Sequence, residues 1–452
     1  LSTQFGRRNY FAASIMIFTI CSFLCGNAHG IWELVVFRFL QGLGGGALLA
    51  TSQTIITEAY PPEKRNMAQA IYGLGVIVGP TLGPPLGGFI VENYSWPYIF
   101  YINIPIGVIA TLLTLQFVRN PNYGTKSATK DIDFLGIILL AISVGSLQYV
   151  LEKGQDDDWF SNGFIVLFTC TALMSGFFFI WRQLTYRNPI VNLRVLKNGN
   201  LRIGTALTFL LGFGLYGTTF IIPLYTQSTL GWTAFQAGML LVPASITTAF
   251  LMPITGVILS KGVPQQFLVS TGMLVFACFC FWGYFILTNS TPEENFFWML
   301  VTRGVGLPLL FIPITSLSLS TLKGLEIGQG VAFTGMMRQV GGSFGVALIT
   351  TYMARQNMFH RSTLVTKLSV DDPAVTGRVA ALQHGFIARG MQPDVALHSA
   401  YKALDYSVTS QANVLSYMDV FYHLGLLFLI FIPFVMFVKR SKKKMEISEA
   451  MH

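Results

Sequence analysis

The sequence predicts an all-α, polytopic membrane protein. Of its 452 residues, 52% are hydrophobic and only 11% are charged, whereas a soluble domain carries about 25% charged residues. Apolar stretches of the length needed to cross a bilayer core, about 20 residues, recur along the whole chain. Twelve spans are predicted, over residues 9–26, 31–55, 67–91, 97–118, 133–151, 160–181, 203–226, 235–259, 265–287, 296–320, 328–353 and 418–438.

Positive charge lies mainly on one set of the connections between these spans. Nineteen of the 29 Lys and Arg residues fall there, whereas the short connections on the other side hold only Lys153, close to three aspartates. By the positive-inside rule, the basic connections and the C-terminus are cytoplasmic in a cytoplasmic (inner) membrane. The net charge of +9 therefore does not indicate a nucleic-acid partner.

Polar linkers divide the chain into three parts. Residues 1–118 form a front block, residues 119–200 hold two spans with their linkers, and residues 201–452 form a back block of six spans. The back block contains the long outer loop 355–417. Pro393 and Asp394 can begin a helix there, and apolar residues follow at helical spacing, so the last span is predicted to begin well outside the bilayer.

Arginines occur inside three apolar spans. Arg38 in VVFRFLQGLGGGAL and Arg303 in MLVTRGVGLPLLF hold similar places in the front and back blocks, as in membrane proteins built from repeated halves around a central site. Arg338 is the third. A charge at the bilayer centre costs at least about 2.5 kcal/mol on insertion scales and marks a pathway or a buried partner. For Arg38, the alternative is a side chain that reaches the outer membrane surface.

The stretch GLGVIVGPTLGPPLGGFI, residues 73–90, is rich in glycine and proline. Gly75, Gly79, Gly83 and Gly87 are four residues apart, so they form a helix face on which another helix can approach closely. Prolines leave backbone carbonyls that need neighbouring helices or a water-filled cavity. The stretch is either a static packing seam or a bendable gate.

A second pattern points to a different class of protein. Gly341 to Gly345, GGSFG, fits the G-x-S-x-G motif of a hydrolase nucleophile, but the motif requires a strand-turn-helix context that this apolar segment lacks. A membrane-embedded serine hydrolase using Ser343 is therefore a remote alternative. Histidine, cysteine and carboxylate residues show no metal-ligand spacing, so we expect no metal and no cofactor.

Several motifs together resemble one family. FGRR at Phe5 to Arg8, RFLQG at Arg38 to Gly42 and GPTLGPPLGG at Gly79 to Gly88 are similar to three signatures of the major facilitator superfamily. WPYIFYINIPIG from Trp96, IPLYTQSTLG from Ile222 and MRQVGGSFGVALITT from Met337 resemble its fourteen-span drug:proton antiporter branch, the EmrB/QacA-type multidrug exporters.

The resemblance implies a fold of two six-helix bundles plus a central extra helix pair, with the first two helices missing from this chain. It implies a transporter and not an enzyme: a secondary active exporter that exchanges protons for amphipathic drugs by alternating access. On this basis the proton pathway is assigned to Arg38, Gln41, Arg303 and Arg338. The gate is assigned to Gly75, Gly79, Pro80, Gly83, Gly87 and Gly88, and the inner-loop gating motif to Gly6, Arg7 and Arg8.

Three further expectations accompany the resemblance. The inner-loop signature usually has an Asp where this chain has Thr3, and the principal proton acceptor is expected upstream of Leu1, so that residues 1–452 alone are not expected to perform coupled exchange. Residues 355–417 resemble the loop of exporters that bind a periplasmic adaptor protein and an outer-membrane channel. A transporter of the same fold that moves a nutrient or metabolite is the alternative function.

Overall fold

The computed structural model describes residues 6–61, 64–119, 133–186, 189, 193–322, 325–369 and 371–436. The basic segments 120–132 and 439–444, with Thr3, Phe5 and Lys323, lie outside them. Every regular element within them is a helix. The α-helices are α2 (Arg7–Gly26), α3 (Ile31–Ala59), α4 (Arg65–Asn93), α5 (Tyr98–Tyr101), α6 (Asn103–Phe117), α7 (Phe134–Lys153), α8 (Gly163–Thr185), α9 (Gly199–Ser228), α10 (Ala234–Met239), α11 (Val242–Ser260), α12 (Gln265–Ile286), α13 (Glu293–Leu319), α14 (Leu325–Thr366), α15 (Pro373–Ile387) and α16 (Pro393–Met436).

The predicted polytopic all-α fold is confirmed. In the described parts of the chain, eleven helical segments are long and apolar enough to cross a membrane. One predicted span, 328–353, lies within the 42-residue helix α14, which is not among those eleven helical segments. Glycines and polar side chains lower its apolarity.

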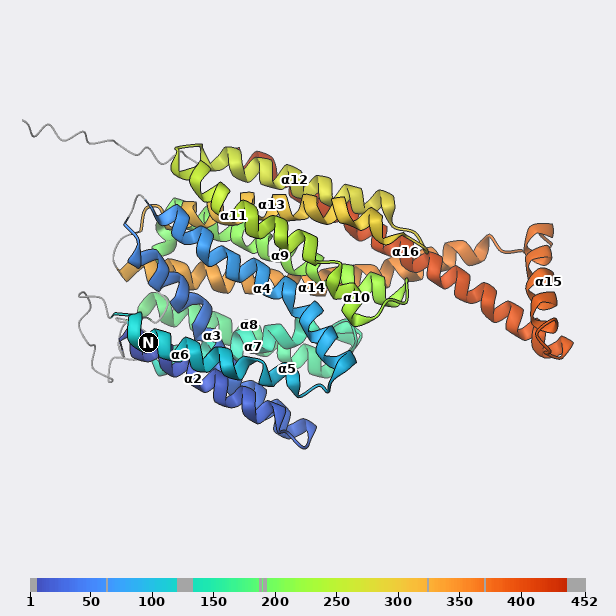
Figure 1. Ribbon diagram of the computed structural model, residues 1–452, viewed down its shortest axis with the longest axis horizontal. Helices are drawn as coiled ribbons and strands as arrows, with labels where there is room; N and C mark the ends of the chain where they lie inside the picture. Colours follow the sequence, from blue (N-terminus) through green and yellow to red (C-terminus); the bar gives the residue numbers. More distant parts are fainter. Residues whose placement is uncertain are drawn as a thin grey trace, which may run out of the picture.

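The helices run roughly side by side (Figure 1). α2 packs on α3 and α6, whereas α4 makes its main contacts with α10, α11 and α13 of the back block. α7 and α8 form a hairpin, and α7 also touches α14. Asp133 joins the two helices of this hairpin: its buried carboxylate accepts hydrogen bonds from Gly136 N (2.9 Å), Arg182 Nε (2.7 Å) and Gln183 Nε2 (2.9 Å).

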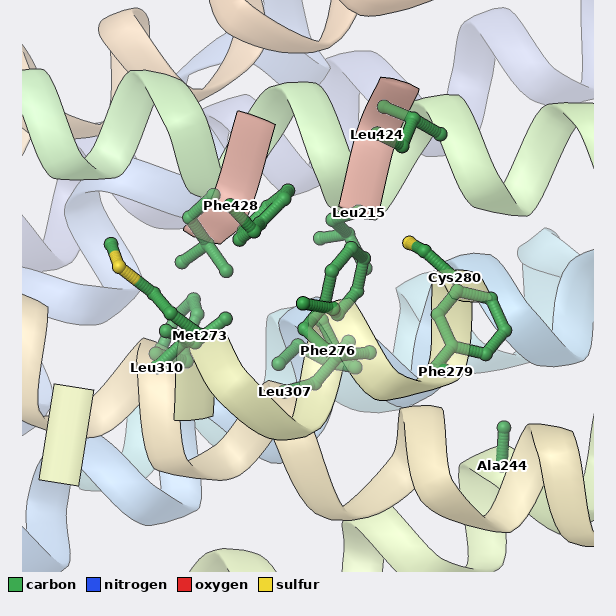
Figure 2. Close-up of a cluster of buried hydrophobic side chains, with 14 of the residues drawn as sticks. Leu215, Ala244, Met273, Phe276, Phe279, Cys280, Leu307, Leu310, Leu424 and Phe428 are labelled. Carbon is green, nitrogen blue, oxygen red and sulfur yellow. The ribbon is translucent and has the colours of Figure 1, made fainter. Parts of the chain in front are cut away.

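The main apolar core lies in the back block. Phe276 and Phe279 of α12 face α13 and α16, and the Phe276 and Phe428 ring centroids are 4.4 Å apart (Figure 2). Leu215 of α9 and Leu307 of α13 complete this contact region. In a membrane, the close van der Waals packing of these large side chains, and not their removal from water, holds these four helices together.

A projecting arm leaves the helical body at one end (Figure 1). It consists of residues 355–366 of α14, all of α15 and residues 393–417 of α16. α16 is a single helix of 44 residues, so the helix predicted to continue into the last span is confirmed. The expected loop is largely helical at its start as well, because no glycine or proline interrupts residues 346–366.

Candidate transport site

A cavity of about 540 Å³ lies between helices of the front and back blocks. α3 contributes its wall from Gly46 to Gln53, α4 contributes Tyr72, α7 contributes Leu140, and α14 contributes residues from Gln329 to Gln339. Such a volume fits a ligand of drug size. Most of the lining is apolar, with Leu49, Leu140, Phe333 and Met336 among the larger side chains.

Arg338 supplies the positive charge at this cavity. Its side chain is 4% exposed, Nη2 donates to the Tyr72 hydroxyl at 3.4 Å, and the guanidinium carbon lies 5.2 Å from the Phe311 ring centroid. None of the described residues that line the cavity carries a carboxylate. The cavity therefore presents one nearly dehydrated cation in a mainly apolar wall.

Amide side chains form a second polar group beside the cavity. Gln53 Nε2 donates to Gln69 Oε1 at 2.9 Å, and Gln69 Nε2 donates to Thr57 Oγ1 at 2.6 Å. All three residues are buried. Because an unpaired buried amide costs about 1 to 3 kcal/mol, this chain of bonds fixes the Gln53 side chain and ties α3 to α4.

Arg38 does not lie at the cavity. Its side chain is exposed, Nη1 donates to Gln41 Oε1 at 3.3 Å, and the guanidinium carbon is 4.5 Å from the Phe100 ring centroid. The expectation of a buried charge is therefore not met in this structure: Arg38 is exposed and its guanidinium stacks on Phe100 of α5, while its role in a proton pathway stays a prediction. Gln41 itself is buried.

Arg303 lies elsewhere, in the core of the back block. It is 0% exposed; Nε donates to Thr218 Oγ1 at 3.1 Å, and Nη2 donates to the Leu215 carbonyl at 3.3 Å and to Thr219 Oγ1. Nη1 has no hydrogen-bond partner among the described residues. Dipoles of α9 thus stabilise a buried cation that has no carboxylate partner there.

The predicted close-packed glycine face is open in this structure. A Cβ added to Gly75, Gly79, Gly83 or Gly87 would meet nothing within 4 Å, so the expectation that another helix packs there is wrong for this conformation. α4 makes its close contacts through its other faces. Gly88 lies against the backbone of Phe235, and Gly238 of α10 approaches the backbone of Pro84 and Pro85.

The proline-rich stretch remains helical. α4 continues through Pro80, Pro84 and Pro85 to Asn93, although each interior proline removes a backbone donor. Gly238 of α10 approaches the backbone of α4 at Pro84 and Pro85, between the open Gly83 and Gly87. α4 thus has a close contact with α10 in the same segment where prolines remove backbone hydrogen-bond donors.

At the other end of the front block, the inner-loop residues form an ion pair. Gly6 precedes α2 with a φ of 82°, a backbone conformation that favours glycine. The Arg7 guanidinium pairs with the Glu58 carboxylate, joining the start of α2 to the end of α3, and both side chains are largely buried. Arg8 points to the exposed side.

Ser343 lies within helix α14, where its hydroxyl donates to the Gln339 carbonyl at 3.2 Å. This is the backbone bond of an ordinary helical serine, and the strand-turn-helix context of a hydrolase nucleophile is missing at this position.

Sequence reasoning identified Arg338 but missed the residues around it. Tyr72, Gln53, Gln69, Gln329 and Gln339 were not predicted as site residues. A usable signal was present, because polar amides inside apolar spans are costly unless they have partners or face a cavity. The sequence does not indicate which spans bring these amides together.

These features define a polytopic transporter with a central cavity between helix bundles. The chain belongs to the Major Facilitator Superfamily, whose family model matches residues 1–346. The human organic anion transporter MFSD10 has the same fold with a TM-score of 0.56 at 15% identity, covering 95% of this chain and 78% of that one. The Escherichia coli xylose transporter XylE gives 0.54 at 14% identity, covering 98% and 83%.

Curated relatives cover nearly the whole chain. The fatty acid resistance protein FarB of Neisseria gonorrhoeae is 32% identical over 440 residues, 97% of this chain and 84% of the relative. The multidrug export protein EmrB of Escherichia coli K12 is also 32% identical over 440 residues, with the same coverage. The predicted resemblance to the EmrB-type exporter branch is therefore confirmed.

Proposed function

We propose that the protein is a secondary active multidrug exporter that exchanges protons for amphipathic compounds by alternating access. The observation that carries this proposal is the cavity of about 540 Å³ between the two blocks, with Arg338 at its wall. A site between two packed units can be exposed first to one side and then to the other as the units rock. The names of EmrB and FarB support export as the direction.

The cavity wall also supports a class of substrate. Its one charged group among the described lining residues is cationic, and its large side chains are apolar. An anionic amphipath, with a carboxylate or phenolate at one end and an apolar body, would pair with Arg338 and cover Leu49, Leu140 and Phe333. A charge-assisted bond of this kind is about twice as strong as a neutral one. The name of FarB, a fatty acid resistance protein, is consistent with this class.

The same wall disfavours the alternative of a nutrient transporter for sugars. A sugar exposes hydroxyls over its whole surface and needs polar partners all round, because each buried unpaired hydroxyl is costly. Leu49, Leu140, Phe333 and Met336 offer none, and the polar side chains cover only part of the wall: Gln53, Tyr72, Gln329, Arg338 and Gln339. XylE shares the fold, but a fold alone does not define a substrate.

Proton coupling is proposed for Arg38, Gln41, Arg303 and Arg338. Arg303 is the strongest candidate for an electrostatic role within the core, because its buried cation is balanced by dipoles alone among the described residues. Gly75, Gly79, Pro80, Gly83, Gly87 and Gly88 are proposed as the gate, with the open glycine face closing in another conformation. Gly6, Arg7 and Arg8 are proposed to latch the inner side.

We place the protein in the cytoplasmic membrane with its C-terminus cytoplasmic, because the basic connections favour that orientation. The arm then projects outward, and residues 355–417 are proposed to bind a periplasmic adaptor protein that leads to an outer-membrane channel. Deletion of residues 361–412 should spare substrate binding in detergent and weaken co-purification of the adaptor. Undiminished co-purification would place the docking surface elsewhere.

The function is tested with everted membrane vesicles from cells that express these residues together with the two spans expected before Leu1, since residues 1–452 alone are not expected to perform coupled exchange. This form serves as the wild type in every transport test. Energised vesicles have an acidic lumen, and an exporter moves its substrate into it. We expect accumulation of several amphipathic compounds that stops when an ionophore collapses the pH gradient. Accumulation that is unaffected by the ionophore would contradict proton exchange, and no accumulation of any amphipath would contradict export.

A further inference from the structure

A titratable cluster lies where the projecting arm joins the helical body. His360 of α14 and Asp419 of α16 are 2.7 Å apart, between Nε2 and Oδ2. Their side chains are 19% and 29% exposed, so water reaches both. His423, one turn further along α16, has Nδ1 at 2.7 Å from the Asp419 carbonyl oxygen.

Few of the side chains around His360 and Asp419 are of a type that ordinarily changes charge near neutral pH. On α14, the Tyr352 hydroxyl is 3.2 Å from His423 Nδ1, and Arg361 pairs with Asp405 further out on the arm. On the neighbouring helices, Tyr284 of α12 contacts Tyr422, and Tyr225 of α9 contacts Tyr417. Histidine is the residue type here whose charge ordinarily changes between pH 5 and 8.

The two helices differ in how they are held. α16 is anchored to α9, because the Tyr417 hydroxyl lies 2.9 Å from Ser228 Oγ and the Tyr225 and Tyr417 ring centroids are 5.2 Å apart. α14 reaches α16 at this level through polar side chains, with Asn357 Nδ2 donating to Asn413 Oδ1 at 2.5 Å and His360 meeting Asp419. Of these two links, only the second contains ionisable side chains.

We propose that His360 and Asp419 form a proton-binding site that tightens the junction between α14 and α16. Neutral His360 donates a hydrogen bond to the Asp419 carboxylate. Once protonated, His360 also carries a positive charge, which adds the attraction of an ion pair to that bond. Proton binding at this pair therefore pulls the outer part of α14 toward the anchored helix α16.

A single helix, α14, connects the His360–Asp419 pair to the cavity. α14 is one unbroken helix that carries Arg338 at the cavity and His360 at the arm, separated by about 33 Å at about 1.5 Å per residue. Proton binding at His360 thus biases the position of α14, the helix that also carries Arg338 at the cavity. The proton site does not depend on the proposed transport function, since it is defined by this helix pair alone.

The test is hydrogen-deuterium exchange of the purified protein at about pH 8 and about pH 5.5, on either side of an ordinary histidine pKa. Rates are corrected for the intrinsic pH dependence of amide exchange. We expect residues 355–366 to exchange on the order of fivefold more slowly at the lower pH, the upper range for a partly exposed ion pair. An unchanged corrected rate in the wild-type protein would overturn the proposal.

Variants identify the group responsible. His360→Gln keeps a neutral donor close to the position of Nε2 but cannot titrate, so its response to pH should disappear while its exchange at pH 8 stays near wild type. Asp419→Asn should also lose the response. His398→Gln, an exposed histidine on the same helix α16, is the matched control and should keep it. A full response in His360→Gln, or a response lost in His423→Gln alone, would overturn the assignment.

Discussion

The Arg338 guanidinium donates to the Tyr72 hydroxyl at 3.4 Å, which joins α14 to α4 across 266 positions of sequence. This bond connects a helix of the back block to the helix that carries the glycine face. The cavity lies beside it, so the same arginine is placed both to hold the two helices and to pair with an anionic ligand. Its substitution should therefore affect ligand affinity more strongly than substitution of its tyrosine partner.

Arg338→Gln should weaken binding of an amphipathic carboxylate by about ten- to a hundredfold. A hydrogen bond to a charged group is worth about 1.5 to 3 kcal/mol, and about 1.4 kcal/mol corresponds to tenfold in affinity. Calorimetric titration of the detergent-purified protein measures it. Tyr72→Phe should cost no more than about tenfold, and Arg361→Gln, on the arm, should have no effect. If Arg338→Gln bound the carboxylate as tightly as the wild type does, Arg338 would not be part of the binding site.

Gln53→Leu and Gln69→Leu should each lower the free energy of unfolding by about 1 to 3 kcal/mol, because the first leaves Gln69 Oε1 and the second leaves Gln53 Nε2 buried without its partner. The double variant should cost less than the sum of the two, since neither partner is then left alone. Thermal unfolding of the wild type, the two single variants and the double variant completes a double-mutant cycle. Strict additivity would show that the two amides do not interact.

Gly79→Leu and Gly88→Leu should separate the open and the packed faces of α4. In this conformation Gly79 has open space around it, whereas Gly88 touches the backbone of Phe235. Gly79→Leu should thus fold with near wild-type thermal stability but lose transport, because the face cannot close. Gly88→Leu should lower thermal stability, and Leu82→Ala is the mild control. Normal transport by Gly79→Leu would show that the glycine face does not close during the cycle.

Arg38→Ala and Arg303→Ala should both impair efflux but differ in stability. Arg38 is exposed and Arg303 is fully buried. Arg38→Ala should change the free energy of unfolding by less than about 0.5 kcal/mol, whereas Arg303→Ala should cost about 2 to 5 kcal/mol through the space it leaves. The prediction for efflux is tested by transport assays in cells that contain equal amounts of each variant in the membrane. Wild-type efflux in either variant would remove that arginine from the proton pathway.

Arg7→Glu and Glu58→Arg should each destabilise the protein, since breaking a largely buried ion pair by altering one partner costs about 3 to 5 kcal/mol. The double exchange should recover a substantial part of the loss. Thermal unfolding reports the recovery, and transport shows whether the pair also gates. A double variant no more stable than the worse single variant would show that the pair contributes little.

The sequence was sufficient for elements that depend on local composition. Apolar runs located the spans because burial in lipid requires about 20 such residues, and Pro393 with the periodicity after it located the start of α16. The same reasoning ended the predicted span at residue 353, whereas α14 continues to Thr366. Hydropathy marks where a helix leaves the membrane and not where the helix ends.

The site depended on long-range contacts that the pattern does not contain. The spacing of Gly75, Gly79 and Gly83 predicts a face without side chains, but whether a helix covers that face depends on the conformation. Arg38 and Arg303 have similar sequence surroundings, yet one is exposed and the other buried, because different neighbours pack around their helices. Gln53 and Gln69 meet only once α3 and α4 have packed.

The most direct test of the account is accumulation of radiolabelled dodecanoate, an anionic amphipath, in energised everted vesicles containing wild-type protein or Arg338→Gln. A weak acid distributes passively toward the alkaline side, so accumulation in the acidic lumen requires transport. The account predicts accumulation by the wild type that collapses with the pH gradient and is reduced about tenfold or more by Arg338→Gln. Equal accumulation by the wild type and Arg338→Gln would contradict it.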